Sequence, residues 1–134
     1  MTQKLHNRAV TVDGKTFPSV REANRYRELS LLQRAGKISN LILQEKYVLI
    51  PAQYETVDTG ELYRAGPRRG QKKTKRICIE KECAYYADFS YIENGEKVVE
   101  DAKGFRDPSS AAYAKYIIKR KLMLFIHHIR VREV

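Results

Sequence analysis

Two segments of alternating side chains, joined by an Asn-Gly pair, constrain this chain more than any other part of its sequence. Residues 84–92 alternate aromatic or small apolar side chains with polar ones, and Asp88 interrupts this otherwise aromatic stretch. Asn94-Gly95 is a dipeptide favoured in two-residue hairpin turns, and residues 97–102 should return as the next strand. The sequence therefore predicts a β-hairpin with an acidic residue inside an apolar strand.

The rest of the chain predicts helices and strands around this hairpin. Ser19 is a suitable N-cap for a helix over residues 18–36, and Ser109 or Ser110 could cap a second helix that runs to about His127. Strands are expected at 38–50, 77–82 and 129–134. The expected core order is αβββαβ, which gives an α/β fold with a mixed central sheet flanked by helices. Because 134 residues is an ordinary size for one domain, residues 1–134 are expected to form a single domain.

The composition points to a polyanionic partner. The chain has 26 Lys and Arg against 16 Asp and Glu, a formal net charge of +10. A strongly basic surface attracts nucleic acid first, and anionic membranes or acidic proteins second. Residues 1–15 lack the apolar run of a signal peptide and no stretch is long enough for a membrane span, so a cytoplasmic protein without membrane contact is expected.

Residues 60–76 form one basic segment, with seven Lys and Arg against the single Glu61, and no core face can be drawn through it. It has two interpretations, a solvated hairpin tip or loop, and an arm that lies along a phosphate backbone. Its candidate nucleic-acid-binding residues are Arg64, Arg68, Arg69, Lys72, Lys73, Lys75 and Arg76.

The hairpin brings Asp88 and Asp101 close together, because they lie on neighbouring strands on either side of the turn. A bound cation would offset the repulsion between two carboxylates, and oxygen ligands favour Mg²⁺ or Mn²⁺. Lys103 should share a face with Asp101, since side chains two apart in a strand point the same way. Ala102 could add its carbonyl oxygen as a metal ligand. The alternative is a pair of carboxylates in surface salt bridges.

Three further candidates have plain structural explanations. Glu22 follows Ser19 by three residues, which is also the spacing of a capping box. Lys119 and Lys121 on the second expected helix could approach phosphate, but a basic helix face is often simply solvated.

Asp88 followed by Asp101-x-Lys103 after a hairpin, within the αβββαβ order, resembles the PD-(D/E)XK nuclease superfamily over nearly the whole chain. The pattern is also similar to a family of small uncharacterised phage proteins and to resolvase-like endonucleases. The resemblance implies a restriction-endonuclease-like core with Asp88, Asp101 and Glu22 at a metal site and Lys103 as the catalytic lysine. Ala87 stands where the motif has Pro, and Gln44 is a weaker addition to the site.

These observations predict a Mg²⁺- or Mn²⁺-dependent endonuclease that hydrolyses DNA, including branched DNA such as Holliday junctions. The resemblance implies 5′-phosphate and 3′-hydroxyl products, a possible homodimer, and the host cytoplasm if the chain is phage-encoded. The alternative is a non-catalytic nucleic-acid-binding accessory protein of phage recombination or packaging. A third class is an interaction subunit whose basic face meets an acidic protein.

Overall fold

The computed structural model describes residues 8–102, 107 and 109–134, and it divides the chain into two compact units. The first unit combines Met1–Tyr47 with Tyr85–Val134, and the second is Val48–Ala84. Each unit is described by itself below. Within the described residues, neither helix is long and apolar enough to cross a membrane.

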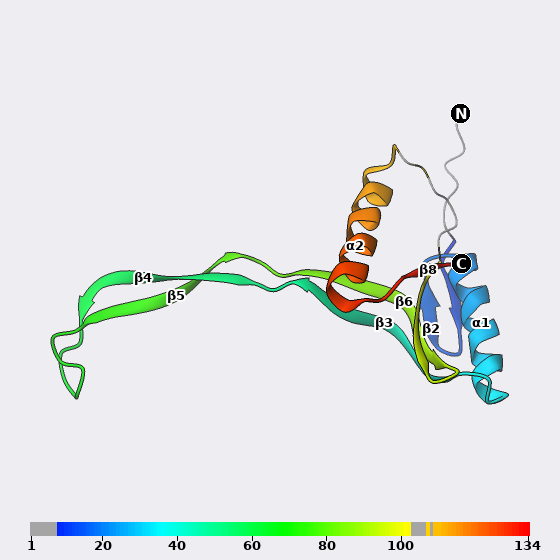
Figure 1. Ribbon diagram of the computed structural model, residues 1–134, viewed down its shortest axis with the longest axis horizontal. Helices are drawn as coiled ribbons and strands as arrows, with labels where there is room; N and C mark the ends of the chain where they lie inside the picture. Colours follow the sequence, from blue (N-terminus) through cyan, green and yellow to red (C-terminus); the bar gives the residue numbers. More distant parts are fainter. Residues whose placement is uncertain (1–7, 103–106, 108) are drawn as a thin grey trace. The chain divides into compact units, whose positions relative to one another are not determined.

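The first unit is an α/β structure built around a four-stranded mixed sheet with the order β3-β6-β7-β8. Strands β6 and β7 are antiparallel, whereas β7 and β8 are parallel. The predicted α/β class with a mixed central sheet is therefore confirmed, and α1, β3, β6, β7, α2 and β8 follow in the expected order (Figure 1). The element bounds are β1 Val10–Val12, β2 Lys15–Phe17, α1 Val20–Arg34, β3 Ser39–Ile50, β6 Cys83–Glu93, β7 Glu96–Asp101, α2 Ala111–His127 and β8 Arg132–Glu133.

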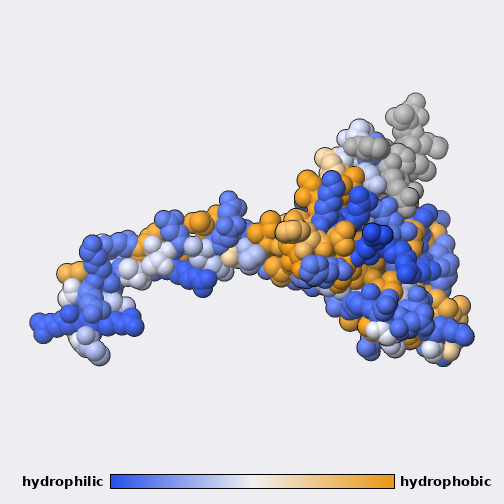
Figure 2. All heavy atoms as spheres, viewed as in Figure 1, coloured by the Kyte–Doolittle hydropathy of each residue, from blue (hydrophilic) through white to orange (hydrophobic). Residues whose placement is uncertain are grey.

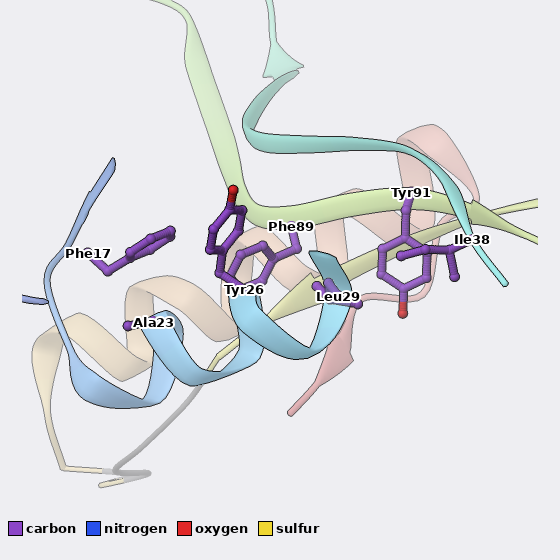
Figure 3. Packing of buried hydrophobic residues seen from close by; sticks show 7 residues of the cluster. All are labelled: Phe17, Ala23, Tyr26, Leu29, Ile38, Phe89 and Tyr91. Atoms are coloured by element: carbon purple, nitrogen blue, oxygen red, sulfur yellow. The ribbon is translucent and has the colours of Figure 1, made fainter. Parts of the chain in front are cut away.

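Helix α1 forms where the sequence predicts it and packs against the sheet through aromatic residues. The Ser19 hydroxyl accepts a 3.1 Å hydrogen bond from the backbone N–H of Glu22 and so caps the helix. Tyr26 and Leu29 point from α1 toward Phe89 and Tyr91 of β6 (Figure 3). This cluster is the core on the α1 side of the sheet.

The short hairpin β1–β2 was not predicted, although its turn carries a recognisable signal. Asp13 and Gly14 link the two strands with φ angles of 51° and 74°. A two-residue turn with positive φ at both positions is the type favoured by Asp-Gly. The hairpin adds Phe17 to the core around α1, where its ring lies 5.0 Å from that of Tyr26.

Strand β3 changes its packing partners halfway along. Leu41 and Leu43 pack against the α1 core, whereas the Tyr47 ring contacts the His127 ring of α2. Alternation alone would put all three side chains on one face. Gln44, with a φ of 53°, lies between them, and such a left-handed residue interrupts the pleat as in a β-bulge. Gln44 therefore lies where the packing partners of β3 change from the α1 core to α2.

Helix α2 begins after Ser110, whose hydroxyl accepts a 3.4 Å hydrogen bond from the Tyr113 N–H. It ends at His128, which adopts the left-handed conformation of a helix C-terminus. This confirms the second predicted helix and its end near His127. Through Tyr116, whose ring lies 6.5 Å from that of Tyr85, α2 contacts β6.

The second unit is a two-stranded antiparallel ribbon, β4 Gln53–Leu62 and β5 Lys72–Glu80 (Figure 1). One strand expectation was wrong here. Residues 77–82 were expected in the central meander, but 77–80 belong to β5 and pair with β4. Residues 60–76, for which a hairpin tip, a loop or an arm was considered, contain the ends of β4 and β5 and the tip that joins them. The available sequence signal for β4 was a group of residues that favour strands, namely Thr56, Val57 and Thr59.

The tip of the ribbon is an ordered hydrogen-bonded loop. Tyr63 and Gln71 are joined by a 2.9 Å backbone bond, and the Gly70 N–H donates to the Tyr63 carbonyl at 2.8 Å. Inside this closure the Arg69 N–H donates to the Gly66 carbonyl at 3.1 Å. These hydrogen bonds fix the backbone conformation of the basic tip.

Candidate carboxylate site

The hairpin of β6 and β7 places Asp88 beside Asp101. Phe89 pairs with Glu100, so the next position along both strands sets the two aspartates opposite each other on one face. Asn94 and Gly95 form the connecting turn with φ angles of 53° and 78°, the left-handed values that an Asn-Gly hairpin turn requires. The predicted closeness of the two carboxylates is therefore confirmed.

Two donors hold the Asp88 carboxylate. The Ala102 N–H donates to its Oδ2 at 2.9 Å, and Nε2 of Gln44 donates to its Oδ1 at 3.2 Å. Gln44 is the residue whose left-handed backbone interrupts β3. A non-glycine residue in this conformation costs about 1–2 kcal/mol of stability, and residues with such backbone strain cluster at functional sites.

Asp101 is held by a different group and is almost fully buried, with 4% of its surface exposed. The Tyr85 hydroxyl donates a 2.6 Å hydrogen bond to its Oδ2. Burial and the negative charge of Asp101 raise the pKa of Tyr85 well above its usual value, so Tyr85 remains a hydrogen-bond donor at every physiological pH.

Asp101 influences the ionisation of Asp88. Burial raises the pKa of Asp88 to about 7, and the charge of Asp101, a hydrogen bond to it and the charge of Glu22 act in the same direction. The Ala102 N–H opposes the change by favouring the charged form. Near neutral pH a proton on Asp88 therefore reduces the repulsion between the two carboxylates, and a cation bound between them would do the same.

The carboxylates open into a pocket of about 340 Å³ in the first unit. Lys115 and Lys119 of α2 line the same pocket, and Glu22 contributes from α1. The pocket thus joins negative groups that suit a cation to positive groups that suit a phosphate. Its complete lining is Glu22, Tyr85, Tyr86, Asp88, Asp101, Ala102, Ala112, Lys115, Tyr116 and Lys119.

The structure brings together most of the residues predicted for catalysis and metal binding. Glu22, Asp88, Asp101 and Ala102 line this pocket, as does Lys119. Lys103, the expected catalytic lysine, lies outside the described residues. Lys121 lines a different hollow of about 440 Å³ with Arg120, Leu124, Arg130, Val131 and Glu133.

Glu22 contacts the helix cap through its backbone and lines the pocket with its side chain. Its backbone N–H bonds the Ser19 hydroxyl, which is half of a capping box. Its side chain lines the carboxylate pocket, and its charge raises the pKa of Asp88. Helix capping therefore places Glu22 at the pocket without excluding a part in the site.

The chemistry of the donors suits Mg²⁺ or Mn²⁺. Within residues 8–102, 107 and 109–134, no group of three or more His, Cys, Asp or Glu side chains is arranged to hold a metal ion. Mg²⁺, however, is commonly held by one or two carboxylates and completes its coordination with water. Asp88 and Asp101, with the Ala102 carbonyl, could supply such a partial ligand set.

The predicted nucleic-acid-binding residues of the arm all lie in the second unit. The Arg76 guanidinium lies 3.7 Å from the Tyr54 ring centre, and Arg68 and Lys73 lie 5.8 and 5.5 Å from that of Tyr63. Lys72 pairs with Asp58 at 3.7 Å. Arg64 and Arg69 line a hollow of about 580 Å³ at the tip, and Lys75 is exposed.

A buried ion pair next to the site was missed by the sequence analysis. Glu100 has no exposed surface, and Arg25 of α1 donates to both of its carboxylate oxygens at 2.8 and 2.7 Å. The Tyr91 hydroxyl donates to the same carboxylate. Because Glu100 precedes Asp101, this two-point contact fixes α1 against the strand that carries the site.

Tyr85 and Lys115 were not predicted as site residues. Lys115 could have been found from its spacing, since 112, 115, 116 and 119 fall on one face of a helix. Tyr85 gave no such signal, because it alternates with the core residues Ala87 and Phe89 and was read as one of them.

Comparison with known proteins places the chain in one family. No curated protein and no solved structure matches it. The family model described as Protein of unknown function (DUF1064) matches residues 2–132. This match covers almost the whole chain, both units included, and the chain therefore belongs to the DUF1064 family.

Proposed function

We propose that this protein is a divalent-metal-dependent phosphodiesterase that cuts DNA, with a restriction-endonuclease-like core of the PD-(D/E)XK type. The observation that carries the proposal is the pair of facing carboxylates, half-buried Asp88 and buried Asp101, whose shared environment raises the pKa of Asp88 to about 7. Two carboxylates so placed on adjacent strands repel each other unless a proton or a cation lies between them. Lys115 and Lys119 line the same pocket and supply the positive charge that a phosphodiester requires.

Mg²⁺ or Mn²⁺ would supply Lewis-acid chemistry at this pocket and a bound water of lowered pKa. Asp88 and Asp101 would hold the ion, with the Ala102 carbonyl as a further oxygen. Gln44 and Tyr85 fix the orientation of the two carboxylates through hydrogen bonds of 3.2 and 2.6 Å. An ion would therefore meet ligands that are already oriented, which lowers the cost of assembling the site.

The lysines would act on the phosphate. A phosphodiester gains negative charge on its non-bridging oxygens as water forms the new P–O bond and the leaving 3′ oxygen departs. An ammonium group beside those oxygens stabilises that charge. Lys119 and Lys115 are candidates from the pocket, and Lys103 remains the candidate that the superfamily motif implies.

The experiment that tests this proposal is cleavage of a panel of linear, single-stranded and four-way-branched DNA in Mg²⁺, Mn²⁺ or EDTA. We expect cutting with either metal, none in EDTA, and a loss of at least about 100-fold in Asp88→Asn and Asp101→Asn. Asp13→Asn is the matched control, because it makes the same chemical change at an exposed turn.

Lys119→Ala, Lys115→Ala and Lys103→Ala would then identify the lysine that acts on the phosphate. A purified protein that binds DNA tightly but cuts neither DNA nor RNA with either metal would overturn the proposal. The non-catalytic nucleic-acid-binding accessory protein would then be the better description.

A further inference from the structure

The β4–β5 ribbon has almost no interior. Every side chain of β4 and β5 is exposed except those of Val57 and Lys73, which are half-buried. A bare two-stranded ribbon is at best marginally stable in water, and it usually gains stability from a third layer. The ribbon therefore presents both of its faces to whatever partner covers it.

Its charge identifies the chemistry of that partner. Residues 63–76 contain seven Lys and Arg and no Asp or Glu. Figure 2 shows the segment between β4 and β5 as predominantly hydrophilic. A patch of this sign and density is the electrostatic counterpart of a polyanion.

The strand register places positive charge on both faces of the ribbon. Val57 pairs with Lys75 and Thr56 pairs with Arg76, so these two cations project from opposite faces. A flat anionic surface such as a membrane would use only one face. A groove with a phosphate backbone along each wall would use both.

The aromatic rings of the ribbon favour a duplex over a single strand. Binding of unpaired bases relies on exposed aromatic faces on which bases stack. In the ribbon a cation already lies over each ring, with Arg76 at 3.7 Å from Tyr54, and with Lys73 and Arg68 at 5.5 and 5.8 Å from Tyr63. These contacts stiffen the arm and occupy surface that stacking would need.

We infer that the β4–β5 ribbon inserts into the major groove of B-form DNA. The B-form major groove is about 12 Å wide and admits a two-stranded ribbon, whereas that of A-form RNA is too narrow. The ten residues of β4 extend about 30 Å, close to one turn of the duplex. The inference rests on the proposed nucleic-acid substrate and adds the form of that substrate and the element that grips it.

The test is fluorescence anisotropy of the full chain carrying Asp101→Asn, in EDTA, so that binding is measured without cleavage. The probes are duplex DNA, single-stranded DNA, duplex RNA and anionic phosphatidylserine vesicles. The arm variant is Arg64→Ala with Arg69→Ala and Lys75→Ala, three exposed residues of the second unit. The control is Arg8→Ala with Lys37→Ala and Arg130→Ala, which removes the same charge from exposed positions of the first unit.

We expect the arm variant to lose more than about tenfold in duplex affinity at 0.1 M salt and the control less than about threefold. The slope of log affinity against log salt should fall by about two to three in the arm variant, close to 0.9 for each lost phosphate contact. Methyl green, which occupies the major groove, should compete with the protein, and netropsin in the minor groove should not. If the arm variant does not fold, Lys75→Gln alone should reduce the slope by about one.

Equal losses in the two triple variants would overturn the inference, because net charge alone would then explain binding. So would tighter arm-dependent binding of single strands, duplex RNA or vesicles than of duplex DNA. These outcomes are distinct from failure of the proposed catalysis, which would leave duplex binding in EDTA unchanged.

Discussion

The Tyr85 hydroxyl donates a 2.6 Å hydrogen bond to Oδ2 of Asp101, and both side chains are buried in the first unit. This bond orients one of the two carboxylates that would hold a metal ion. Residues that orient metal ligands commonly change metal affinity by about 10–100-fold when they are removed. Tyr85 is therefore expected to matter for the site without touching the phosphate itself.

Tyr85→Phe should weaken Mn²⁺ binding by about tenfold, measured by titration calorimetry of the full chain. Tyr54→Phe makes the same change in the second unit, at a residue that is 46% exposed, and should bind Mn²⁺ like the wild type. Equal affinities in all three proteins would show that the hydroxyl does not prepare the site.

Gln44 allows the backbone and side-chain contributions to be separated. Gln44→Gly keeps the positive φ without strain but removes the hydrogen bond to Asp88, so it should lower DNA cleavage and leave the melting temperature nearly unchanged. Gln44→Val should lower the melting temperature as well, because a β-branched residue at this φ costs about 1–2 kcal/mol or more. Thermal melts and cleavage rates of both variants test this, and full activity in Gln44→Gly would contradict a role for the amide.

The raised pKa of Asp88 predicts how stability depends on pH in EDTA. The unfolded carboxyl loses its proton near pH 4, whereas the folded one keeps it to about pH 7. The folded protein thus binds more protons between these values, so the free energy of unfolding should fall as pH rises from 4 through 7. Urea denaturation at pH 5, 6, 7 and 8 measures the trend. Asp88→Asn should flatten it, and Mg²⁺ should restore stability at pH 8 more than at pH 5.

Glu100 and Glu28 both bind Arg25 but differ in burial, which makes them a matched pair. Glu100 is fully buried and Glu28 has 63% of its side chain exposed. Glu100→Ala should destabilise the protein by about 3–5 kcal/mol, because it leaves the Arg25 charge without its buried partner. Glu28→Ala should cost less than about 1 kcal/mol, as exposed pairs do. Equal costs in denaturant unfolding would show that Glu100 does not anchor α1 to β7.

The residue pattern of the chain was sufficient to predict its local structure. Both helices begin after the serines that cap them, and the Asn94-Gly95 turn brings Asp88 to Asp101 as predicted. These features depend on backbone preferences and on period-two alternation, which act over a few residues and can be read from neighbouring letters.

The contacts that complete the site depend on residues far apart in the chain. Gln44 reaches Asp88 across 44 positions, and Arg25 reaches Glu100 across 75. Neither contact follows from a local preference, because each needs the sheet order β3-β6-β7 and the packing of α1 on it. The pairing of β4 with β5 likewise depends on cross-strand hydrogen bonds. It could not be predicted from this charged stretch of sequence, because register is weakly specified where apolar residues do not alternate. Strand pairing and helix packing thus decided the surroundings of the two aspartates, whereas the turn between them had already decided that they meet.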